Sequence, residues 1–436
     1  MDILKKIQNA GVVGAGGAGF PTHVKLDCNV EFVIANGAEC EPLLQADLRL
    51  MESEAGAVVE GLSLAMKQVG AKEGIIFIKS HYKEAAQALT KQIEHNKSIR
   101  LHISKNYYPA GDEQQVIYEV TRRVVPPGDL PKDIGAVVLN VSTIIDIANA
   151  LKDIPVTKRY ITVAGAIKNP QTLQVPIGTP MIELINMAGA VAQDDNAYII
   201  GGPCMGTVID TLEGHVVTKT TNGLLVIPRA HPLLHKKSVD IRFKAMLSVC
   251  CQCNMCTQMC PRNALGLGTS PHKAMRSIAS GVDLIGNVNS ILTCCDCGVC
   301  TYHACNFGLN PALIMNRLKQ EMMTGGIRPN PQSVSKVDSH IDFKRLSTQR
   351  LLARLGLTKY DSPAPICALN RQIMNVKIPL KMHIGSAALP TVIQGDYVRH
   401  GTLIASPPEK TMGANIHASI DGVVKEITSD YIEIEK

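Results

Sequence analysis

The chain has 436 residues, of which 45% are hydrophobic and 19% are charged, and its formal net charge is +6. This composition excludes wholesale disorder, and the length predicts roughly three or four domains. The sequence has no run of five or more lysines and arginines and no apolar window of membrane-spanning length, so we expect neither a nucleic-acid partner nor a membrane span.

The cysteine content indicates the kind of site to expect. Fourteen cysteines are present, and ten of them fall between Cys250 and Cys305. The N-terminal residues lack the features of a signal peptide, so we expect a cytoplasmic protein whose clustered cysteines bind metal rather than form disulfides.

The first motif in chain order is a glycine-rich loop, GVVGAGGAGFPT, at residues 11–22. Gly14, Gly16 and Gly19 spell GxGxxG, which in a dinucleotide-binding turn follows a strand and precedes a helix. Here the preceding residues look helical, and only ten residues separate Gly19 from the next strand-like run. The spacing therefore favours a different phosphate-binding loop with exposed glycine N–H groups, and a structural glycine hinge remains the alternative.

Strand-like and helix-like runs then alternate as far as residue 153. The strand-like runs are 30–36, 74–80, 99–104 and 136–142, and the helix-like runs are 44–69, 82–96, 112–123 and 143–153. This alternation predicts a mostly parallel sheet covered by helices, with ligands bound at the carboxyl ends of the strands. The loops NGAECEP and NVST, at residues 36–42 and 140–143, lie at such ends and are candidate binding loops.

The later parts of the chain have a different texture. Residues 156–230 read as a small β-rich module with one helix, residues 326–365 as a polar linker, and residues 379–434 as short β runs separated by turns. In the last segment we expect Lys410, His383, His400 and His417 to be surface groups without a bound prosthetic group.

Two cysteine runs form the strongest motif. Residues 250–261 contain CxxCxxCxxxCP and residues 294–305 contain CxxCxxCxxxxC. In two-cluster ferredoxins the fourth cysteine of each run binds the other cluster. We therefore assign one [4Fe-4S] cluster to Cys250, Cys253, Cys256 and Cys305, and the other to Cys294, Cys297, Cys300 and Cys260.

Three features qualify this assignment. The second run has one extra residue before Cys305 and Asn306 in place of the usual proline, so whether Cys305 is a ligand stays open. A pair of zinc sites is the alternative, although zinc would leave the third cysteine of each run without a role. Cys251 and Cys295 lie in the wrong register, and we expect them to pack beside the clusters.

Several motifs together resemble a known family. GAGGAGFPTHVK, NGAECEP, YPAGDEQ, VPPGDLP and NVST resemble the flavin-binding part of the Rnf complex C subunit and, more distantly, the flavin subunit of respiratory complex I. The tail is similar to the barrel-sandwich domain that begins the Rnf C subunit. Its C-terminal position here, with the irregular second cysteine run, resembles most closely the cobalamin reductase family of bacterial propanediol utilisation.

The resemblance implies an α/β multidomain fold. The expected parts are a Rossmann-like parallel-sheet domain for FMN and NADH at 1–155, an SLBB β-grasp domain at 156–235, and a helical domain for two [4Fe-4S] clusters at 236–325. A linker at 326–370 and a barrel-sandwich hybrid domain at 371–436 complete the expected order.

The resemblance also implies the site residues. By motif position, FMN is expected to contact Gly14, Gly16, Gly17, Gly19, Lys25, Asn36, Glu39, Asn140 and Thr143, and NADH is expected to contact Phe20, Glu41 and Glu113. Glycine N–H groups and a lysine suit a phosphate, and amide side chains suit the polar edge of a flavin. No residue is expected to act as an acid, base or nucleophile.

The implied function is an oxidoreductase that takes a hydride from NADH and releases single electrons through the two clusters. On the acceptor side the resemblance implies cobalamin, or a corrinoid enzyme or adenosyltransferase, with microcompartment shell proteins as further partners. The alternatives are an electron-input subunit of an Rnf-type membrane complex, a microcompartment reductase with another acceptor, and a non-catalytic zinc-binding scaffold.

Overall fold

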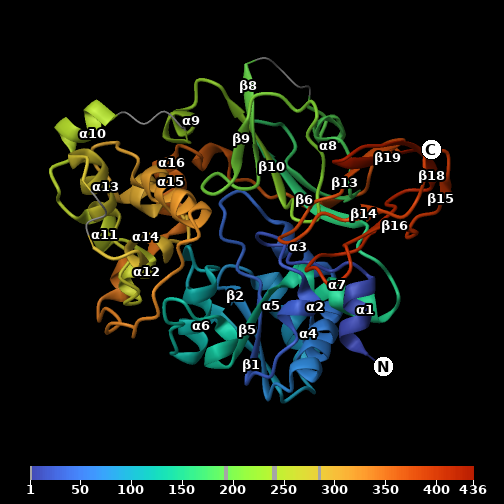
Figure 1. Ribbon diagram of the computed structural model, residues 1–436, viewed down its shortest axis with the longest axis horizontal. Helices are drawn as coiled ribbons and strands as arrows, with labels where there is room; N and C mark the ends of the chain where they lie inside the picture. The colour runs from blue at the N-terminus through green and yellow to red at the C-terminus, as the bar shows by residue number, and fades with distance from the viewer. Residues whose placement is uncertain (1, 191–194, 238–242, 283–285) are drawn as a thin grey trace.

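The computed structural model describes residues 2–190, 195–237, 243–282 and 286–436. In Figure 1 a parallel sheet with its helices lies at the bottom and a β-rich part lies above it. The cysteine-rich helices lie on the left and the last strands of the chain on the right. The multidomain α/β organisation expected from the sequence is confirmed.

The first domain is built on a four-stranded sheet in which every pair of neighbours is parallel. Its order is β3 (Ile99–Ser104), β2 (Glu73–Lys79), β1 (Phe32–Asn36) and β5 (Ala136–Asn140). Its helices are α3 (Ala46–Ser53), α4 (Ala55–Val69), α5 (Lys83–Ile93), α6 (Glu113–Thr121) and α7 (Val141–Leu151). The predicted alternation is confirmed, except that the single helix expected over 44–69 is divided at Glu54 into α3 and α4.

The glycine-rich loop lies outside this sheet. It follows helix α1 (Ile3–Asn9) and precedes the short helix α2 (Thr22–Lys25). An antiparallel bridge between Val13 and Pro21 closes the loop, and the Gly14 N–H donates to the Phe20 carbonyl at 2.9 Å. The loop therefore lacks the strand that a Rossmann turn requires, as the spacing predicted.

The β-rich module has a mixed sheet in the order β12-β7-β6-β10-β8-β9. Its own elements are β6 (Lys158–Gly165), β7 (Gln171–Pro176), α8 (Met181–Met187), β8 (Asn196–Ile200), β9 (Thr207–Ile209) and β10 (Gly223–Pro228). The edge strand β12 (Ile366–Cys367) comes from much later in the chain and pairs with β7 in parallel. The predicted composition of strands with one helix is confirmed within the described residues.

The cysteine-rich region consists of short helices around a small separate core. The helices are α9 (Pro232–Lys237), α10 (Phe243–Val249), α11 (Met255–Gln258), α12 (Pro261–Ala264), α13 (Pro271–Ser280), α14 (Asn289–Leu292), the π-helix Cys300–Ala304 and α15 (Pro311–Thr324). Met246, Met275 and Met315 are among the buried residues of the core. Short helices separated by loops leave the cysteines free to face one another.

The segment after α15 differs from the polar linker expected from its composition. It forms β11 (Leu346–Ser347), which pairs with β4 (Tyr107–Tyr108), and the helix α16 (Thr348–Leu355). Leu351, Leu352 and Leu355 lie on one face of α16 and are buried, because residues three and four apart share a helix face. The segment is therefore packed against the first domain over part of its length.

The C-terminal strands form two small sheets. One sheet contains β13 (Asn375–Pro379), β19 (Tyr431–Glu435), β18 (Gly422–Ile427) and β15 (Tyr397–Val398), and the other contains β14 (Leu389–Pro390), β16 (Leu403–Ser406) and β17 (Ile416–His417). Lys410 and His400 are exposed, as expected. The expectation for His383 and His417 is wrong, because each is only 7% exposed.

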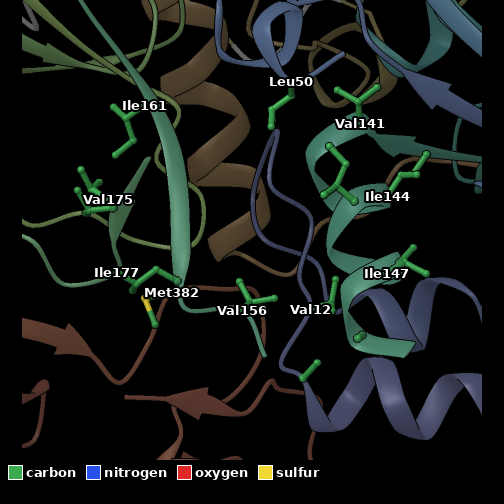
Figure 2. Close-up of a cluster of buried hydrophobic side chains, with 14 of the residues drawn as sticks. Val12, Leu50, Val141, Ile144, Ile147, Val156, Ile161, Val175, Ile177 and Met382 are labelled. Carbon is green, nitrogen blue, oxygen red and sulfur yellow. The ribbon is translucent and has the colours of Figure 1, made fainter. Parts of the chain in front are cut away.

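One hydrophobic core joins the first domain, the β-rich module and the C-terminal strands. In Figure 2 Ile144 and Ile147 of α7 lie on one side of the view and Ile161 and Val175 of the β-rich module on the other, and Leu50, Val12 and Val156 of the same cluster lie between them. The cysteine-rich core is a separate cluster. The glycine-rich loop thus belongs to a continuously packed three-part body.

Candidate functional site

A pocket of about 430 Å³ lies at the carboxyl edge of the parallel sheet. All twelve residues expected to contact FMN or NADH line it: Gly14, Gly16, Gly17, Gly19, Phe20, Lys25, Asn36, Glu39, Glu41, Glu113, Asn140 and Thr143. Asn36 and Asn140 are register partners at the ends of β1 and β5, which explains why distant loops meet here. Cys295 and Cys297 of the cysteine-rich region also line this pocket.

The glycine-rich loop forms one wall of this pocket, which we call the flavin pocket because the expected flavin contacts line it. A Cβ atom at Gly16 would lie 2.9 Å from Asn140 Nδ2, whereas a Cβ at Gly17 would meet no protein atom within 4 Å. The Ala15 N–H donates to the Thr143 hydroxyl at 2.9 Å and holds the loop on helix α7. The hydrogen bonds found within the described ranges leave the Gly16 and Gly17 N–H groups without an acceptor.

The two asparagines are oriented by the protein itself. Asn36 Nδ2 donates to the Gly111 carbonyl at 2.9 Å, and Asn36 Oδ1 accepts from the Ala38 N–H. Asn140 Oδ1 caps helix α7 through the Ser142 N–H, and Asn140 Nδ2 donates to Asp47 Oδ2 at 2.6 Å. Each amide therefore presents a fixed edge to the pocket.

One cation and one carboxylate of the expected set are paired with each other. Lys25 Nζ lies 3.0 Å from Glu113 Oε1, and both side chains are about one-third exposed at 31% and 39%. Solvent weakens a pair of this kind, so a ligand phosphate can draw the lysine away at modest cost.

Asp47 is a pocket residue that the sequence analysis missed. Its backbone N–H donates to Glu39 Oε2 at 3.0 Å, and both residues line the pocket. Burial raises the pKa of Asp47 to about 6 and raises the pKa of Glu39 well above its usual range, with the Asp47 charge adding to the shift of Glu39. Asp47 lies in helix α3, shortly after the NGAECEP loop, which is the signal that could have identified it.

Glu41 has a structural role as well as its place in the pocket. One carboxylate oxygen accepts from the Tyr108 hydroxyl at 3.1 Å, and the other accepts from the Cys204 N–H at 2.7 Å and the Met205 N–H at 3.3 Å. These contacts join the first domain to the β-rich module. A nicotinamide ligand that binds Glu41 would have to do so while Glu41 keeps these contacts between the two domains.

Four of the eight expected cluster ligands gather at one place, and we call them the distal group: Cys250, Cys253, Cys256 and Cys305. Burial raises the pKa of Cys256 to about 12, and the neighbouring Cys305, Cys250 and Cys253 thiols contribute to this shift. Cys305 therefore lies with the first cysteine run despite its irregular spacing. Cys253 is exposed, as is the neighbouring Cys251.

The other four expected ligands gather beside the flavin pocket, and we call them the proximal group: Cys260, Cys294, Cys297 and Cys300. Burial raises the pKa of Cys294 and Cys300, and for both thiols Cys260 is a contributing neighbour. Cys256 is also an electrostatic neighbour of Cys300, so the two groups adjoin. Cys295 contacts Cys297, which agrees with the expectation that it packs beside the ligands.

A buried ion pair holds the cysteine-rich region against the flavin pocket. The Asp112 carboxylate accepts hydrogen bonds from Arg262 Nε at 2.8 Å and from Arg262 Nη2 at 2.5 Å. The Arg262 side chain is 16% exposed and the Asp112 side chain is 9% exposed. Gln115 Nε2 adds a hydrogen bond to the Pro261 carbonyl at 3.0 Å, so the residue after Cys260 is fixed to helix α6.

The residues present fit the two kinds of group that the motifs imply. For FMN, the pocket offers a glycine cradle that is open at Gly17, and a buried Thr22 hydroxyl that has no hydrogen-bond partner among the described residues. For the clusters, all fourteen cysteines are free thiols. Eight of them are electrostatic neighbours within the distal and proximal groups. Within the described ranges, no three His, Cys, Asp or Glu side chains are placed to hold a single metal ion.

Four family models match separate parts of the chain. They are the FMN-binding domain of Nuo51 at residues 7–149, the SLBB domain at 160–208, the 4Fe-4S dicluster domain at 249–310 and the RnfC barrel sandwich hybrid domain at 359–436. The FMN-binding match contains the glycine loop and both asparagines. The dicluster match contains all eight expected cysteine ligands.

Relatives that match along nearly the whole chain are also found. The cobalamin reductase PduS of Salmonella typhimurium is 41% identical over 99% of this chain and 96% of its own length, and that of Citrobacter freundii is 40% identical over the same shares. A third relative, from the Na(+)-translocating ferredoxin:NAD(+) oxidoreductase complex of Acetobacterium woodii, is the C subunit of that complex. This subunit is 43% identical over 59% of this chain and 57% of its own length. In the part of the chain that the structure describes, no helix has the length and hydropathy needed to cross a membrane.

Proposed function

Because the chain belongs to the family of the cobalamin reductase PduS, we propose that it uses NADH to reduce the cobalt of a corrinoid. The proposed reaction converts one NADH and two oxidised acceptors into NAD+, a proton and two acceptors reduced by one electron each. As a member of this family the chain is an oxidoreductase with FMN and two [4Fe-4S] clusters as cofactors. The zinc-scaffold alternative does not agree with the dicluster match.

One observation carries the proposal. The pocket lined by the expected flavin contacts is also lined by Cys297, which belongs to the proximal group of thiols. A hydride donor supplies two electrons together, whereas an iron–sulfur cluster takes one, so a flavin must lie between them. The shared lining gives a direct route from the flavin pocket to the clusters.

We assign the flavin contacts as the motifs imply. The Gly16 and Gly17 N–H groups and Lys25 bind the phosphate, and the fixed amides of Asn36 and Asn140 face the flavin ring. FMN held by these residues would supply the conversion of a hydride into single electrons. Phe20 is 37% exposed at the rim of the pocket, where its ring can cover a nicotinamide.

The carboxyl pair of Glu39 and Asp47 provides a place for a proton at this site. Glu39 is buried and Asp47 is partly buried at the pocket, and loss of solvent favours the protonated form of each. Asn140 Nδ2 holds Asp47 in place at 2.6 Å. This arrangement lets the two carboxyl groups hold a proton beside the flavin ring when the charge of the flavin changes.

The arrangement of the thiols gives a direction for electron flow. The proximal group adjoins the flavin pocket, the distal group adjoins the proximal group, and Cys253 of the distal group is exposed. We therefore place the exit to the acceptor at the distal group. Hydrogen bonds and burial around each group tune how readily it accepts an electron.

Coverage of the relatives supports a corrinoid as the acceptor. The PduS proteins match over 99% of the chain, including the C-terminal strands, whereas the Rnf-type relative matches over 59%. Association with a bacterial microcompartment and its shell proteins is part of the same proposal. An electron-input role in an Rnf-type complex is the second candidate, supported by the 43% identity over that shared portion.

The test is anaerobic reduction of the purified holoprotein by NADH, followed by addition of hydroxocobalamin. We expect the flavin absorption to bleach, the cluster absorption to fall, and the corrinoid spectrum then to change to that of the cob(II)alamin form. Bleaching without a change in the corrinoid would contradict the corrinoid acceptor while leaving the flavin and cluster chemistry in place. An Rnf-type role would instead be indicated by stable association with membrane proteins of such a complex.

A further inference from the structure

Tyr108 lies between the flavin pocket and the proximal group of thiols. It is the last residue of β4, is only 2% exposed, and lines the flavin pocket. Its ring packs in a hydrophobic cluster that also contains Cys297 and Tyr302. No motif in the sequence analysis assigned a role to Tyr108, although it begins the YPAGDEQ stretch.

The hydroxyl of Tyr108 has two acceptors and a single proton. It lies 2.7 Å from the carbonyl oxygen of Cys297 and 3.1 Å from Glu41 Oε1. The shorter contact directs the O–H dipole towards the backbone of an expected cluster ligand. Glu41 is the competing acceptor from the side of the pocket.

We propose that Tyr108 is a positioning residue for electron transfer, acting through Cys297 on the iron–sulfur centre that the proximal group binds. This inference rests on the proposed function. The donated hydrogen bond withdraws electron density from the ligand residue and places the positive end of a dipole near the centre. Both effects favour the reduced state, which carries one more negative charge than the oxidised state.

The step that Tyr108 assists transfers one electron from the reduced flavin to the proximal centre. No covalent bond forms or breaks at Tyr108, and its proton stays on the hydroxyl. NADH supplies the electron pair, and the proton balance is that of the overall reaction. Tyr108 changes the equilibrium of this transfer by stabilising the product side.

The deciding variant is Tyr108→Phe, which removes one oxygen and leaves the ring. The measurement is a redox titration of the reconstituted holoprotein with mediators, followed by electron paramagnetic resonance. At a fixed solution potential we expect the ratio of reduced to oxidised proximal centre to fall about threefold, as for loss of an ordinary hydrogen bond. The distal centre should be unchanged.

The matched control is Tyr302→Phe. The Tyr302 hydroxyl also donates to a cysteine carbonyl in the same cluster of buried residues, that of Cys204 at 3.0 Å. Cys204 is not an expected cluster ligand, so this variant should leave the reduction potential of the proximal centre unchanged. Equal shifts in both variants, or none in either, would overturn the role of Tyr108.

A second variant tests the inference with the opposite sign. In Glu41→Gln the charged competitor is lost and the new amide can donate to the Tyr108 oxygen, so the tyrosine proton is committed to the Cys297 carbonyl. The proximal centre should then be easier to reduce, and the gain should exceed the gain that Glu41→Gln gives in a Tyr108→Phe background, where only the loss of the Glu41 charge acts. Equal gains in the two backgrounds would contradict the inference. Because the titration needs neither NADH nor a corrinoid, its outcome is separate from that of the proposed function.

Discussion

The flavin pocket and the two groups of cysteines differ in how the chain assembles them. Each cysteine group takes three of its expected ligands from a stretch of seven residues and the fourth from the other cysteine run. The flavin pocket instead draws its lining from loops that begin at Gly14 and end at Thr143, with further residues from the β-rich module and the cysteine-rich region. Local spacing therefore specifies three members of each cysteine group, whereas the sheet and the packing of three domains specify the pocket.

This difference teaches where each region is vulnerable. A cysteine group depends on a few side chains that bind directly, so one substitution should remove a whole cofactor. The pocket depends on backbone shape and on contacts between domains, such as the Arg262–Asp112 pair. Substitutions there should weaken binding or stability by degrees.

The largest effect is expected from Cys250→Ala. Loss of this distal ligand should lower the iron content from about eight atoms per chain to about four, and should lower NADH-driven acceptor reduction by about two orders of magnitude. Iron analysis and a stopped-flow assay measure these changes. Cys251→Ala is the matched control, because its thiol is exposed and is expected to bind no iron. Equal losses in both variants would contradict the ligand assignment.

Arg262→Met should give the next largest effect, on the joint between the two regions. It leaves the Asp112 carboxylate buried without its partner, which should lower the free energy of unfolding by about 3 kcal/mol. Urea denaturation measures the change. Arg317→Met removes an exposed ion pair with Glu321 in the same region and should cost about 0.5 kcal/mol or less. Similar costs for the two variants would count against a structural role of the Arg262–Asp112 pair.

Gly17→Ala should weaken flavin binding without disturbing the fold. The added methyl group meets no protein atom within 4 Å and extends into the space assigned to the FMN phosphate. We expect about tenfold weaker FMN binding, as for modest steric overpacking, measured by fluorescence titration of the flavin-free protein. Gly56→Ala, on helix α4 away from the pocket, should leave the affinity unchanged. An unchanged affinity in Gly17→Ala would place the phosphate elsewhere.

The smallest effect is expected from the pH dependence of Asp47. Its pKa of about 6 in the folded protein exceeds the ordinary value of 3.8, so the folded state binds more protons between these values. The contribution of Asp47 to stability therefore falls as the pH rises from about 4 to about 6. Asp47→Asn should raise Tm by about 2 °C at pH 7 and by less as the pH falls towards 4. A difference independent of pH would show that the Asp47 charge is not responsible.

The secondary structure of the first domain could be predicted from periodicity almost entirely. β3 matches the expected run at 99–104, and the split between α3 and α4 at Glu54 is the main difference. The helix α16 was not expected, because the segment around it is polar. Its three buried leucines lie within five residues and are too few to stand out as a helical pattern. The expectation of exposed His383 and His417 was wrong because residues of the first domain lie against them, Gly19 beside His383 and Asn9 beside His417.

The site residues also divide into those that motifs predicted and those that only the structure revealed. The motifs named twelve pocket residues, and all twelve line one pocket, although the roles assigned to them remain proposals. Asp47 and Tyr108 were not named, although Asp47 follows the NGAECEP loop and Tyr108 begins the YPAGDEQ motif, because their places in the site depend on contacts with Asn140 and Cys297.

The sequence by itself determined the alternation of strands and helices, the two cysteine runs and the glycine loop, because each depends on residues close together in the chain. Only the tertiary structure decided that Cys305 lies with the first run, that the proximal group adjoins the flavin pocket, and that Tyr108 links them. These relations depend on how separate domains pack, and packing joins residues such as Tyr108 and Cys297 that no local pattern connects.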